Sequence, residues 1–434
     1  MMSRIYMLWL YRLLFLPVLI IVAPRYLWRM RKRGGYGENF AQRFGASGAL
    51  PPKRAGVRRI WLQAVSVGEM LAIGPVIEAL RREGGVEIYL TTTTSTGFRV
   101  ADDRYHGKVL GPGYFPIDWW GFSHRAWEAV SPDLVILTEG ERWPEHIHQA
   151  KRRGVPVVCI NARLSDRSFR RLRRLAFARE AVFGGLTRVL ATSAQDAARF
   201  RELGVPAERI TTTGNIKLDL QIALLSDAER TQLRKELGLR EGLVLLGSST
   251  WPGEETALLA AWQAASEGGL RCSLLIVPRH AERRMEIERM LRAAQVSYHF
   301  RSRGVAPAAV DVAIGDTTGE LRKLAQLADL VFVGKSLRPN EGGQTPVEAA
   351  ALEKPILFGP AMSNFRLIAA ELLARGAARE IKDAAALTVA VPALLGDAAG
   401  RAEMARAAAQ WRNENAGAVE RTLAAIRAEL AGIR

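Results

Sequence analysis

Carboxylates follow two of the predicted strands in the first half of the chain, where they could take part in acid–base chemistry. Glu69 lies in AVSVGEM, at a strand-to-helix turn, and could accept a proton from a bound hydroxyl group. A carboxylate in the first turn of a helix also interacts favourably with the helix dipole, and local sequence alone favours that structural role for Glu69. Glu139 and Glu141 follow another strand in LTEGERWP, just before Pro144. Packing hardly explains two carboxylates, an arginine and a tryptophan in so short a loop, which indicates a functional role.

Loops in the second half of the chain have the composition of phosphate-binding turns. Small residues precede a proline in GSSTWPGEE, Arg279 follows a strand in VPRH, and Glu320 begins a helix in GDTTGEL. Gly342 and Gly343 stand immediately before a helix that carries Glu348. A glycine-rich turn at a helix N-terminus can receive a phosphate, and a first-turn carboxylate can accept hydrogen bonds from a ribose or a base. Four such loops in strand order indicate a nucleotide or a nucleotide sugar as ligand.

The motifs of several other enzyme classes are absent from the sequence. It contains no Walker motif, no G-x-S-x-G and no Cys–His pair that would support nucleophilic catalysis. Its two cysteines, Cys159 and Cys272, are too few for a disulfide framework or a cysteine zinc site and are expected to be buried thiols. His146 and His148 are two residues apart on a predicted helix, so they do not share a face, and we expect both at the surface. The sequence predicts no metal site.

Short apolar runs alternate with helical patterns along the chain, so the predicted sheets are parallel and covered by helices on both faces. Two such series follow one another, and they predict two doubly wound α/β domains of similar size, joined near residues 215–225 and facing each other across a cleft. Ligands of such sheets bind beyond the carboxyl ends of the strands, where the loops described above lie. The alanine- and arginine-rich C-terminal segment is expected to be helical. The predicted strands are Ile60–Val65, Val86–Thr91, Leu134–Thr138, Val155–Ile160, Arg188–Thr192, Leu243–Gly247, Ser273–Val277, Val312–Ile314, Leu330–Val333 and Pro355–Phe358. The predicted helices include Glu69–Arg82, Ala194–Leu203 and Ser226–Leu237.

Residues 5–24 form an apolar segment about as long as one bilayer-spanning helix, interrupted by Arg12 and Pro17. A cleaved signal peptide would carry its charge before the apolar run, and a soluble core helix would not be apolar nearly all round. The segment therefore predicts a membrane anchor, with everything after residue 25 in the cytoplasm. Arg12 raises the cost of a full span, so both a single span and a helix lying in the interface remain open. The basic cluster that follows consists of Arg25, Arg29, Arg31, Lys32 and Arg33.

The chain of 434 residues carries a formal net charge of +17, which points to anionic partners such as nucleic acid, a membrane surface or phosphorylated substrates. Its composition, 48% hydrophobic and 24% charged, excludes a disordered chain, collagen or a multi-span membrane protein. The segment SDRSFRRLRRLAFAR interleaves arginines, from Arg167 to Arg179, with apolar residues. A charged helix is usually a solvated face, but this interleaving suits a membrane or a phosphorylated lipid.

Taken together, the N-terminal anchor and the motifs AVSVGE, TTTTSTG, EGERWP, NARLSDRS, GNIKLD, VPRH, GDTTGEL and GGQTPVEAA resemble the 3-deoxy-D-manno-octulosonic acid (Kdo) transferases, in the family's order over nearly the whole chain. The resemblance implies a GT-B glycosyltransferase that moves Kdo from CMP-Kdo to the lipid A precursor (lipid IVA), inverting at the anomeric carbon. It implies no metal and no cofactor, a membrane surface with anionic lipids as partner, and the cell inner membrane as location. The implied domains are an anchor with its basic flank (1–33), an acceptor domain (34–215), and a donor domain with a C-terminal helix (216–434).

The family's functional residues can be carried over by motif. Glu69 matches the proton acceptor, and Glu139 and Lys217 match residues thought to stabilise the transition state. The residues that would hold CMP-Kdo are Pro278, Arg279, Thr318, Gly319, Glu320, Thr345, Pro346, Val347 and Glu348.

The sequence departs from the family pattern at four positions. Gln63 stands where a histidine often precedes the first motif, Lys335 replaces a glycine, and Gln344 and Thr345 replace a histidine and an asparagine. The retained Glu348 argues that nucleotide binding survives these changes.

Two other functions compete with this prediction. A GT-B enzyme that uses a UDP-sugar on a lipid acceptor would share the fold, the anchor and the loops. A membrane-tethered protein that binds nucleic acid would suit the net charge, but the basic residues are not interleaved with an aromatic stacking platform, and the carboxylate-bearing loops would repel phosphates. We therefore expect no nucleic-acid partner, and the sequence gives no oligomeric state.

Overall fold

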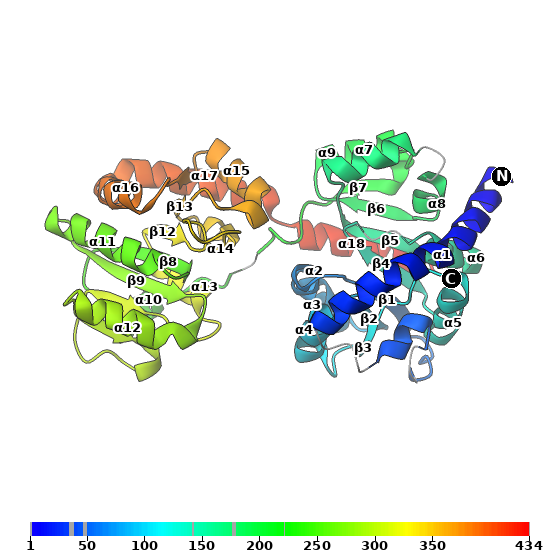
Figure 1. Cartoon of the computed structure of the whole chain (residues 1–434), viewed down its shortest axis with the longest axis horizontal. Helices are drawn as coiled ribbons and strands as arrows, with labels where there is room; N and C mark the ends of the chain where they lie inside the picture. Colours follow the sequence, from blue (N-terminus) through cyan, green and yellow to red (C-terminus); the bar gives the residue numbers. More distant parts are fainter. Residues whose placement is uncertain are drawn as a thin grey trace. The chain divides into compact units, whose positions relative to one another are not determined.

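The computed structural model describes residues 2–33, 39–46, 50–140, 143–175, 179–220 and 222–433. The chain divides into two compact units, which are described separately (Figure 1). Unit 1 comprises Met1–Asp219 and Ala416–Arg434, and unit 2 comprises Leu220–Asn415.

Unit 1 is built on a seven-stranded sheet in the order β3-β2-β1-β4-β5-β6-β7, in which every neighbouring pair is parallel. The strand order reverses between β1 and β4, which makes this pair the topological switch point of the sheet. The strands are β1 (Arg58–Gln63), β2 (Val86–Thr92), β3 (Leu110–Tyr114), β4 (Leu134–Thr138), β5 (Val157–Ala162), β6 (Arg188–Ala191) and β7 (Ile210–Thr212).

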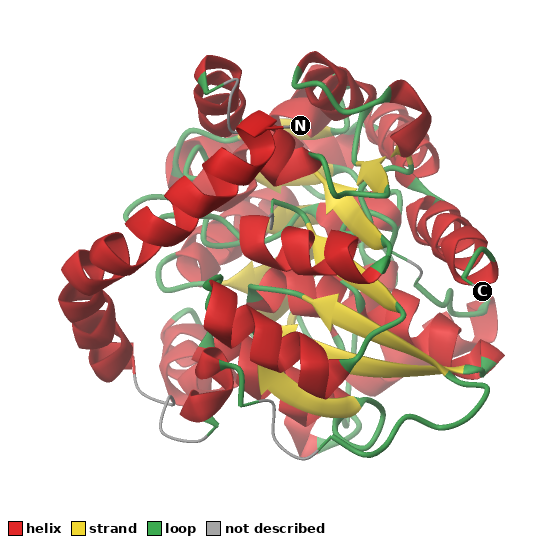
Figure 2. Ribbon diagram, turned by 90° about the vertical axis from the view of Figure 1, so that its right-hand side faces the viewer, coloured by secondary structure: helices red, strands yellow, loops and turns green. Residues whose placement is uncertain are grey.

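Alternate residues of the central strands point to opposite faces of the sheet, and each face has its own apolar core. Ile60 and Leu62 of β1 belong to one buried cluster, and Trp61 between them belongs to the other. Helices cover the strands (Figure 2). They are α1 (Met2–Arg33), α2 (Val67–Ala72), α3 (Gly74–Glu83), α4 (Ser95–Tyr105), α5 (Trp120–Val130), α6 (Pro144–Arg153), α7 (Asp166–Arg174), α8 (Arg179–Phe183), α9 (Ala194–Glu202), α18 (Ala418–Ala431) and the 3₁₀ turns η1 (Phe40–Phe44) and η3 (Ala207–Arg209).

Unit 2 repeats this plan with a parallel seven-stranded sheet in the order β10-β11-β9-β8-β12-β13-β14. Its order reverses between β8 and β12, so these two strands flank the second switch point. The strands are β8 (Leu243–Thr250), β9 (Cys272–Pro278), β10 (Tyr298–Phe300), β11 (Val312–Ile314), β12 (Leu330–Val333), β13 (Ile356–Phe358) and β14 (Ala378–Glu380).

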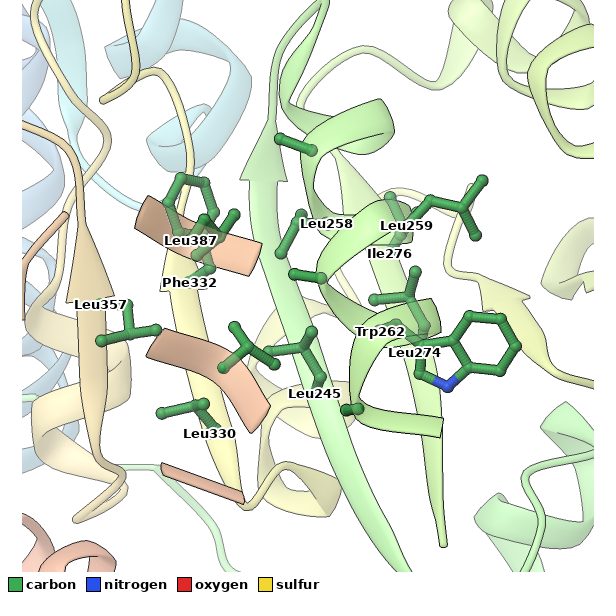
Figure 3. Close-up of a cluster of buried hydrophobic side chains, with 14 of the residues drawn as sticks. Leu245, Leu258, Leu259, Trp262, Leu274, Ile276, Leu330, Phe332, Leu357 and Leu387 are labelled. Atoms are coloured by element: carbon green, nitrogen blue, oxygen red, sulfur yellow. The ribbon is translucent and has the colours of Figure 1, made fainter. Parts of the chain in front are cut away.

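One apolar core of unit 2 lies between its sheet and two helices. Leu245, Ile276 and Phe332 from the strands pack with Leu258 of α11 and Leu387 of α16 (Figure 3). The helices of unit 2 are α10 (Asp227–Leu237), α11 (Glu254–Glu267), α12 (Arg284–Ala293), α13 (Leu321–Leu324), α14 (Val347–Ala351), α15 (Arg366–Ala374), α16 (Ala384–Gly396), α17 (Ala398–Asn415) and the 3₁₀ turns η4 (Ala281–Arg283), η5 (Arg301–Arg303), η6 (Ala325–Leu327) and η7 (Ser363–Phe365). The two parallel seven-stranded sheets confirm the predicted α/β fold class.

The C-terminal segment packs with unit 1, so its assignment to the donor domain (216–434) is corrected, whereas the division after Asp219 lies within the predicted junction at residues 215–225. Leu423 and Ile426 of α18, red in Figure 1, are buried in the same core as Ile60. The carboxylate of Asp219 accepts hydrogen bonds from the backbone N–H groups of Gly417 (3.1 Å) and Val419 (2.7 Å). This carboxylate ties the end of the first unit 1 segment to the beginning of the second.

Other expectations about individual elements also need correction. The predicted helix Glu69–Arg82 is two helices, α2 and α3, because Pro75 lacks an N–H at the break. His146 is buried and not at the surface: its Nδ1 accepts from the indole N–H of Trp127 (3.1 Å) and its Nε2 lies 3.3 Å from the carbonyl of Pro116.

The N-terminal apolar segment is helical throughout α1. The window Leu8–Arg25 is long and apolar enough to cross a membrane, and it is the one such window among the described residues. A helix of this kind is weak evidence of membrane association, since signal sequences and core helices can be equally long and apolar.

Candidate active site

The two predicted catalytic carboxylates of unit 1 flank its switch point. Glu69 follows β1, and Glu139 follows β4, the neighbouring strand on the other side of the reversal. Ligands of doubly wound sheets bind beyond the carboxyl ends of the strands at this position. The two carboxylates, separated by 70 positions in the sequence, are therefore placed at one edge of one sheet.

Glu69 is held by local hydrogen bonds at the beginning of α2. Ser66, the N-cap residue, accepts from the backbone N–H of Glu69 (3.3 Å) and donates through its hydroxyl to Glu69 Oε1 (2.8 Å). Glu69 Oε2 accepts from the backbone N–H of Val65 (3.0 Å) and from the hydroxyl of Thr138 (2.5 Å). Thr138 is the last residue of β4, so its bond joins Glu69 to the strand that leads into Glu139.

Glu139 is surrounded by cations, and it forms an ion pair between its Oε1 and Lys217 Nζ. Its Oε2 accepts from the guanidinium of Arg163 at 3.1 and 3.2 Å. The Glu139 carboxylate is largely buried, whereas the side chain of Arg163 is half exposed. The pair with Lys217 is therefore the better shielded of the two.

Two residues near this ion pair adopt the left-handed backbone conformation. Glu139 has φ +50° and Asn161 has φ +51°, a conformation that costs energy for residues other than glycine and that clusters at functional sites. The Asn161 side chain donates to Glu139 Oε1 (3.4 Å) and accepts from the N–H of Ile216 (3.0 Å). Asn161 thus fixes the segment carrying Lys217 against Glu139.

Glycines bring the loops of this site close together. A Cβ on Gly68 would lie 3.9 Å from Lys217 Nζ, so the ammonium group sits beside the turn that begins α2. Gly97 of α4 has no room for a side chain, because a Cβ there would lie 2.5 Å from the hydroxyl of Thr92. The hydroxyls of Thr92 and Thr94 donate to the carbonyl of Val65, which explains the threonine run as support for the Glu69 loop.

Three of the sequence-predicted residues are therefore gathered in unit 1: Glu69, Glu139 and Lys217. The arrangement offers a carboxylate that can accept a proton, next to a carboxylate–ammonium pair. Glu141, which the sequence singled out beside Glu139, lies outside the described residues.

The predicted donor-binding residues lie in unit 2, on loops that follow β9, β11 and β12. Pro278 ends β9 and is buried, and the exposed Arg279 is tied to β8 through its N–H and the carbonyl of Thr250 (3.1 Å). Thr318 and Gly319 are exposed in the turn before α13.

Glu320 closes that turn with a network of its own. It accepts from the hydroxyl of Thr317 and from Arg301 (3.5 Å). Partial burial alone would raise the pKa of Glu320, but the hydrogen bonds from Thr317 and Arg301 outweigh it and lower the pKa below its ordinary value. Glu320 is therefore ionised at neutral pH and available as an acceptor.

The last predicted set, Thr345 to Glu348, begins α14. The Thr345 hydroxyl accepts from the N–H of Val347 (3.2 Å), and Pro346 is the N-cap residue. Glu348 Oε1 lies 3.7 Å from the guanidinium of Arg322 on α13, while Oε2 is buried with no hydrogen-bond partner among the described residues. Arg322 thereby connects the Glu320 loop with the Glu348 helix.

The sequence predictions missed the residues at the switch point of unit 2. Glu254, at the beginning of α11 after β8, accepts from the backbone N–H groups of Trp251, Lys335, Ser336 and Leu337 at 2.7–3.0 Å. Burial raises the pKa of Glu254 above its usual value, although these four N–H groups act in the opposite direction. The only sequence signal was a first-turn carboxylate after a proline, which usually indicates no more than a helix start.

Lys335 and Trp251 add a cation and a ring at the same place. The Lys335 ammonium lies 4.3 Å from the centroid of the Trp251 ring, and the His280 ring is 5.1 Å from the same indole. Lys335, at a position where the resemblance led us to expect a glycine, has φ +58°, the left-handed conformation that glycine adopts freely. Among the described residues, no group of three or more His, Cys, Asp or Glu side chains could hold a metal ion.

The chain is similar to known proteins over most of its length. Residues 38–220 match the family described as "3-Deoxy-D-manno-octulosonic-acid transferase (kdotransferase)". The 3-deoxy-D-manno-octulosonic acid transferase of Bordetella pertussis is 35% identical over 92% of this chain and 94% of its own length. The enzyme of the same name from Haemophilus influenzae is 31% identical over 95% of this chain and 93% of its own.

A solved structure has a similar fold over most of the chain. The UDP-GlcNAc 2-epimerase of Neisseria meningitidis, bound to UDP-GlcNAc, matches with a TM-score of 0.53 at 14% identity, over 86% of this chain and 100% of that one. At this identity the likeness concerns the fold alone, which is that of the GT-B group. With the identity and coverage of the two relatives above, the chain belongs to the 3-deoxy-D-manno-octulosonic acid transferase family and is a Kdo glycosyltransferase of lipopolysaccharide synthesis.

Proposed function

We propose that the protein transfers Kdo from CMP-Kdo to a hydroxyl group of the lipid A precursor lipid IVA, with inversion and without a metal ion. The observation that carries this proposal is the gathering of Glu69, Glu139 and Lys217 at the switch point of unit 1. Family membership supports Kdo as the sugar, and the motif match supports CMP and lipid IVA.

Glu69 is the proposed proton acceptor. An acceptor hydroxyl is a poor nucleophile until its proton is removed as the new bond forms. In the proposed step the hydroxyl oxygen bonds to the anomeric carbon of Kdo, its proton passes to Glu69, and the bond from that carbon to the CMP phosphate breaks. CMP leaves with the electron pair of the broken bond, so no separate acid is needed.

Glu139 and Lys217 are proposed to stabilise charge as it develops. The sugar acquires oxocarbenium character, which a fixed carboxylate such as that of Glu139 stabilises, while the departing phosphate gains negative charge, which an ammonium group stabilises. Their ion pair holds both groups in place before the reaction, so they need little reorganisation during it.

Unit 2 is the proposed donor-binding unit. Arg279 offers a cation to the phosphate, and Glu320 and Glu348 are acceptors for the hydroxyl and amino groups of the nucleotide. Arg322 connects the helix that follows Glu320 with Glu348, and Glu254 holds the loop after β12, which leads to Glu348.

The proposed location is the cytoplasmic side of the inner membrane. The apolar window of α1 and the basic residues that follow it support attachment to a surface of anionic lipids. The acceptor is itself a lipid, so attachment would bring the enzyme to its substrate.

The test is incubation of the purified protein with lipid IVA and CMP-Kdo, followed by mass spectrometry of the lipid. We expect the lipid mass to rise by one or more Kdo increments, and CMP to inhibit as product. A lipid of unchanged mass, with turnover of a UDP-sugar in its place, would contradict the proposal in favour of the alternative GT-B function.

A further inference from the structure

The helix α1 crosses unit 1 in the view of Figure 1, and its first half is bonded to this unit through Tyr11 and Arg12. We propose that α1 lies in the plane of the membrane surface, fastened to unit 1, and does not cross the bilayer. This inference rests on the proposed membrane attachment and is independent of the transfer chemistry.

Two polar contacts fasten the first half of α1. Arg12 makes a two-pronged ion pair with Glu145, from Nε to Oε2 at 2.9 Å and from a terminal nitrogen to Oε1 at 3.0 Å. Tyr11 donates its hydroxyl to the carboxylate of Asp118 at 2.6 Å. The side chain of Glu145 is fully buried and that of Asp118 almost so, which makes both acceptors part of the interior of unit 1.

The burial pattern extends this contact along the helix. Half-buried residues recur every three or four positions, which is one face of an α-helix. They are Leu8, Tyr11, Arg12, Phe15, Leu16, Leu19 and Ala23. The helix also lies against α8 of unit 1. The contact face therefore extends over about three turns, from Leu8 to Leu19, and ends before the exposed Val22.

The opposite face of α1 is apolar and exposed. Leu13, Ile20 and Ile21 expose 72%, 69% and 77% of their surface. The other exposed large apolar residues of α1 are Trp9, Leu10, Leu14, Val18, Val22, Leu27 and Trp28, and all of them except Val22 lie outside the contact face. Apolar patches of this extent on soluble proteins mark interaction surfaces, and a stripe flanked by tryptophans and basic residues fits the boundary between headgroups and acyl chains.

A spanning α1 would conflict with these contacts. Arg12 lies within the apolar window Leu8–Arg25, so a span would carry both Arg12 and the bound Glu145 toward the hydrocarbon core, together with the polar surface of unit 1. The other possibility is that the ion pair breaks, which leaves a buried carboxylate without its partner. If α1 lies in the plane of the interface, the Arg12–Glu145 ion pair stays intact and the exposed apolar stripe contacts the acyl chains.

Exposed basic residues on α1 and on α7 suit an anionic surface. Arg25 is exposed at the end of the window, and the sequence adds basic residues at 29 and 31–33. The exposed arginines of α7, which α8 follows in the chain, are Arg167, Arg170, Arg171, Arg173 and Arg174. Anionic headgroups attract basic residues close to the membrane surface, so the bilayer is the occupant that we assign to this stripe.

Cysteine labelling of the full chain distinguishes the two topologies. The native Cys159 and Cys272 are buried, so a thiol introduced at Ser3 dominates the labelling by a membrane-impermeant maleimide. We expect Ser3→Cys to react in inside-out membrane vesicles and not in spheroplasts. Ala293→Cys, on an exposed position of α12, is the matched control on the cytoplasmic side. Reaction of Ser3→Cys from the outside of spheroplasts, with the control unreactive there, would overturn the proposal.

Depth measurement gives a second, quantitative readout. Leu14 and Ile21 are both exposed and lie on the same face, seven residues or about 10 Å apart along the helix axis. Nitroxides on Leu14→Cys and Ile21→Cys, in vesicles of phosphatidylethanolamine and phosphatidylglycerol, are expected at equal and shallow depths. A difference near 10 Å would show a span, and labels that stay in water would show that α1 binds no membrane. Neither result depends on whether the enzyme transfers Kdo.

Discussion

At the scale of single residues, Glu139 is the centre of the site of unit 1. It pairs with two cations, Lys217 and Arg163, whose side chains differ in solvent exposure. Lys217 is the less exposed partner, at 28% against 49% for the side chain of Arg163, and it lies beside Gly68 at the beginning of α2. Exposed ion pairs contribute little, about 0–1 kcal/mol, whereas shielded charges act more strongly. The two cations should therefore differ in their effect on catalysis.

We expect Lys217→Met to lower kcat by roughly 100-fold or more, because the charge that would stabilise the leaving phosphate is lost. Arg163→Met, the matched control, removes the other partner of Glu139 and should lower kcat by no more than about 10-fold. Steady-state kinetics with CMP-Kdo and lipid IVA measure both effects. Equal losses in the two variants would contradict the special role of Lys217.

At the scale of elements, the alternation of strands and helices predicted parallel sheets, and the central strands were found in the sequence. The strand order and the switch points became visible only in the structure. The four strands that the sequence did not reveal, β3, β7, β10 and β14, are the four edge strands. β7 and β14 are short and mostly exposed, and β3 contains two glycines and a proline, so none has the continuous apolar pattern of a buried parallel strand. Their pairing depends on a neighbouring strand that the local sequence does not show.

The Glu254 carboxylate is expected to organise the loop after β12 that carries the donor site. In Glu254→Gln, an amide NH₂ group would face backbone N–H donors, so the loop should shift, KM for CMP-Kdo should rise about 10-fold, and the melting temperature should fall. Glu255→Gln is the matched control. It is equally buried and adjacent, but it pairs with Arg283. A raised KM in both variants would show a general loss of stability instead of a loop effect.

The fastening of α1 can be tested through stability. Arg12→Ala leaves the buried Glu145 without its ionic partner, although Gln149 still donates to it (2.8 Å), and should destabilise unit 1 by about 1–3 kcal/mol. Arg25→Ala, at an exposed position of the same helix, should leave the melting temperature in detergent unchanged. Equal melting temperatures for the two variants would show that the Arg12–Glu145 pair contributes nothing.

At the scale of the whole molecule, sequence patterns predicted two α/β units but assigned the C-terminal segment to the wrong one. The alanine-rich helix pattern identifies α18 as a helix, but only Asp219 and the core around Ile60 determine where it packs. In the same way, residue types and family motifs predicted Glu69, Glu139 and Lys217, whereas the ring of N–H groups around Glu254 depends on loops from two strands. Contacts between distant segments are what local sequence does not encode.

One buried group should give the stability of the protein a measurable pH dependence. Burial lowers the pKa of His146 to about 3, and protonation would place a second donor opposite the Trp127 N–H. The unfolded chain takes up this proton near pH 6.5, so stability is fully present above that pH and falls as the pH drops toward 3. Asp118, whose pKa burial raises to about 7, acts in the opposite direction.

Comparison of His146→Gln with the wild type isolates this effect, because Asp118 is the same in both. The melting temperature of the wild type should fall more steeply between pH 6.5 and 4.5 than that of the variant. Parallel curves would contradict the burial of a neutral His146.

The measurement that tests the central claim most directly is the pairing of turnover with donor binding in Glu69→Gln. If unit 1 performs the chemistry and unit 2 holds the donor, this variant should lose nearly all Kdo transfer to lipid IVA. Its affinity for CMP, measured by calorimetry, should stay within about twofold of the wild type. Removal of a general base is expected to lower the rate by roughly 100-fold or more. Retention of more than a few per cent of the wild-type rate would therefore contradict the role of Glu69 as the proton acceptor.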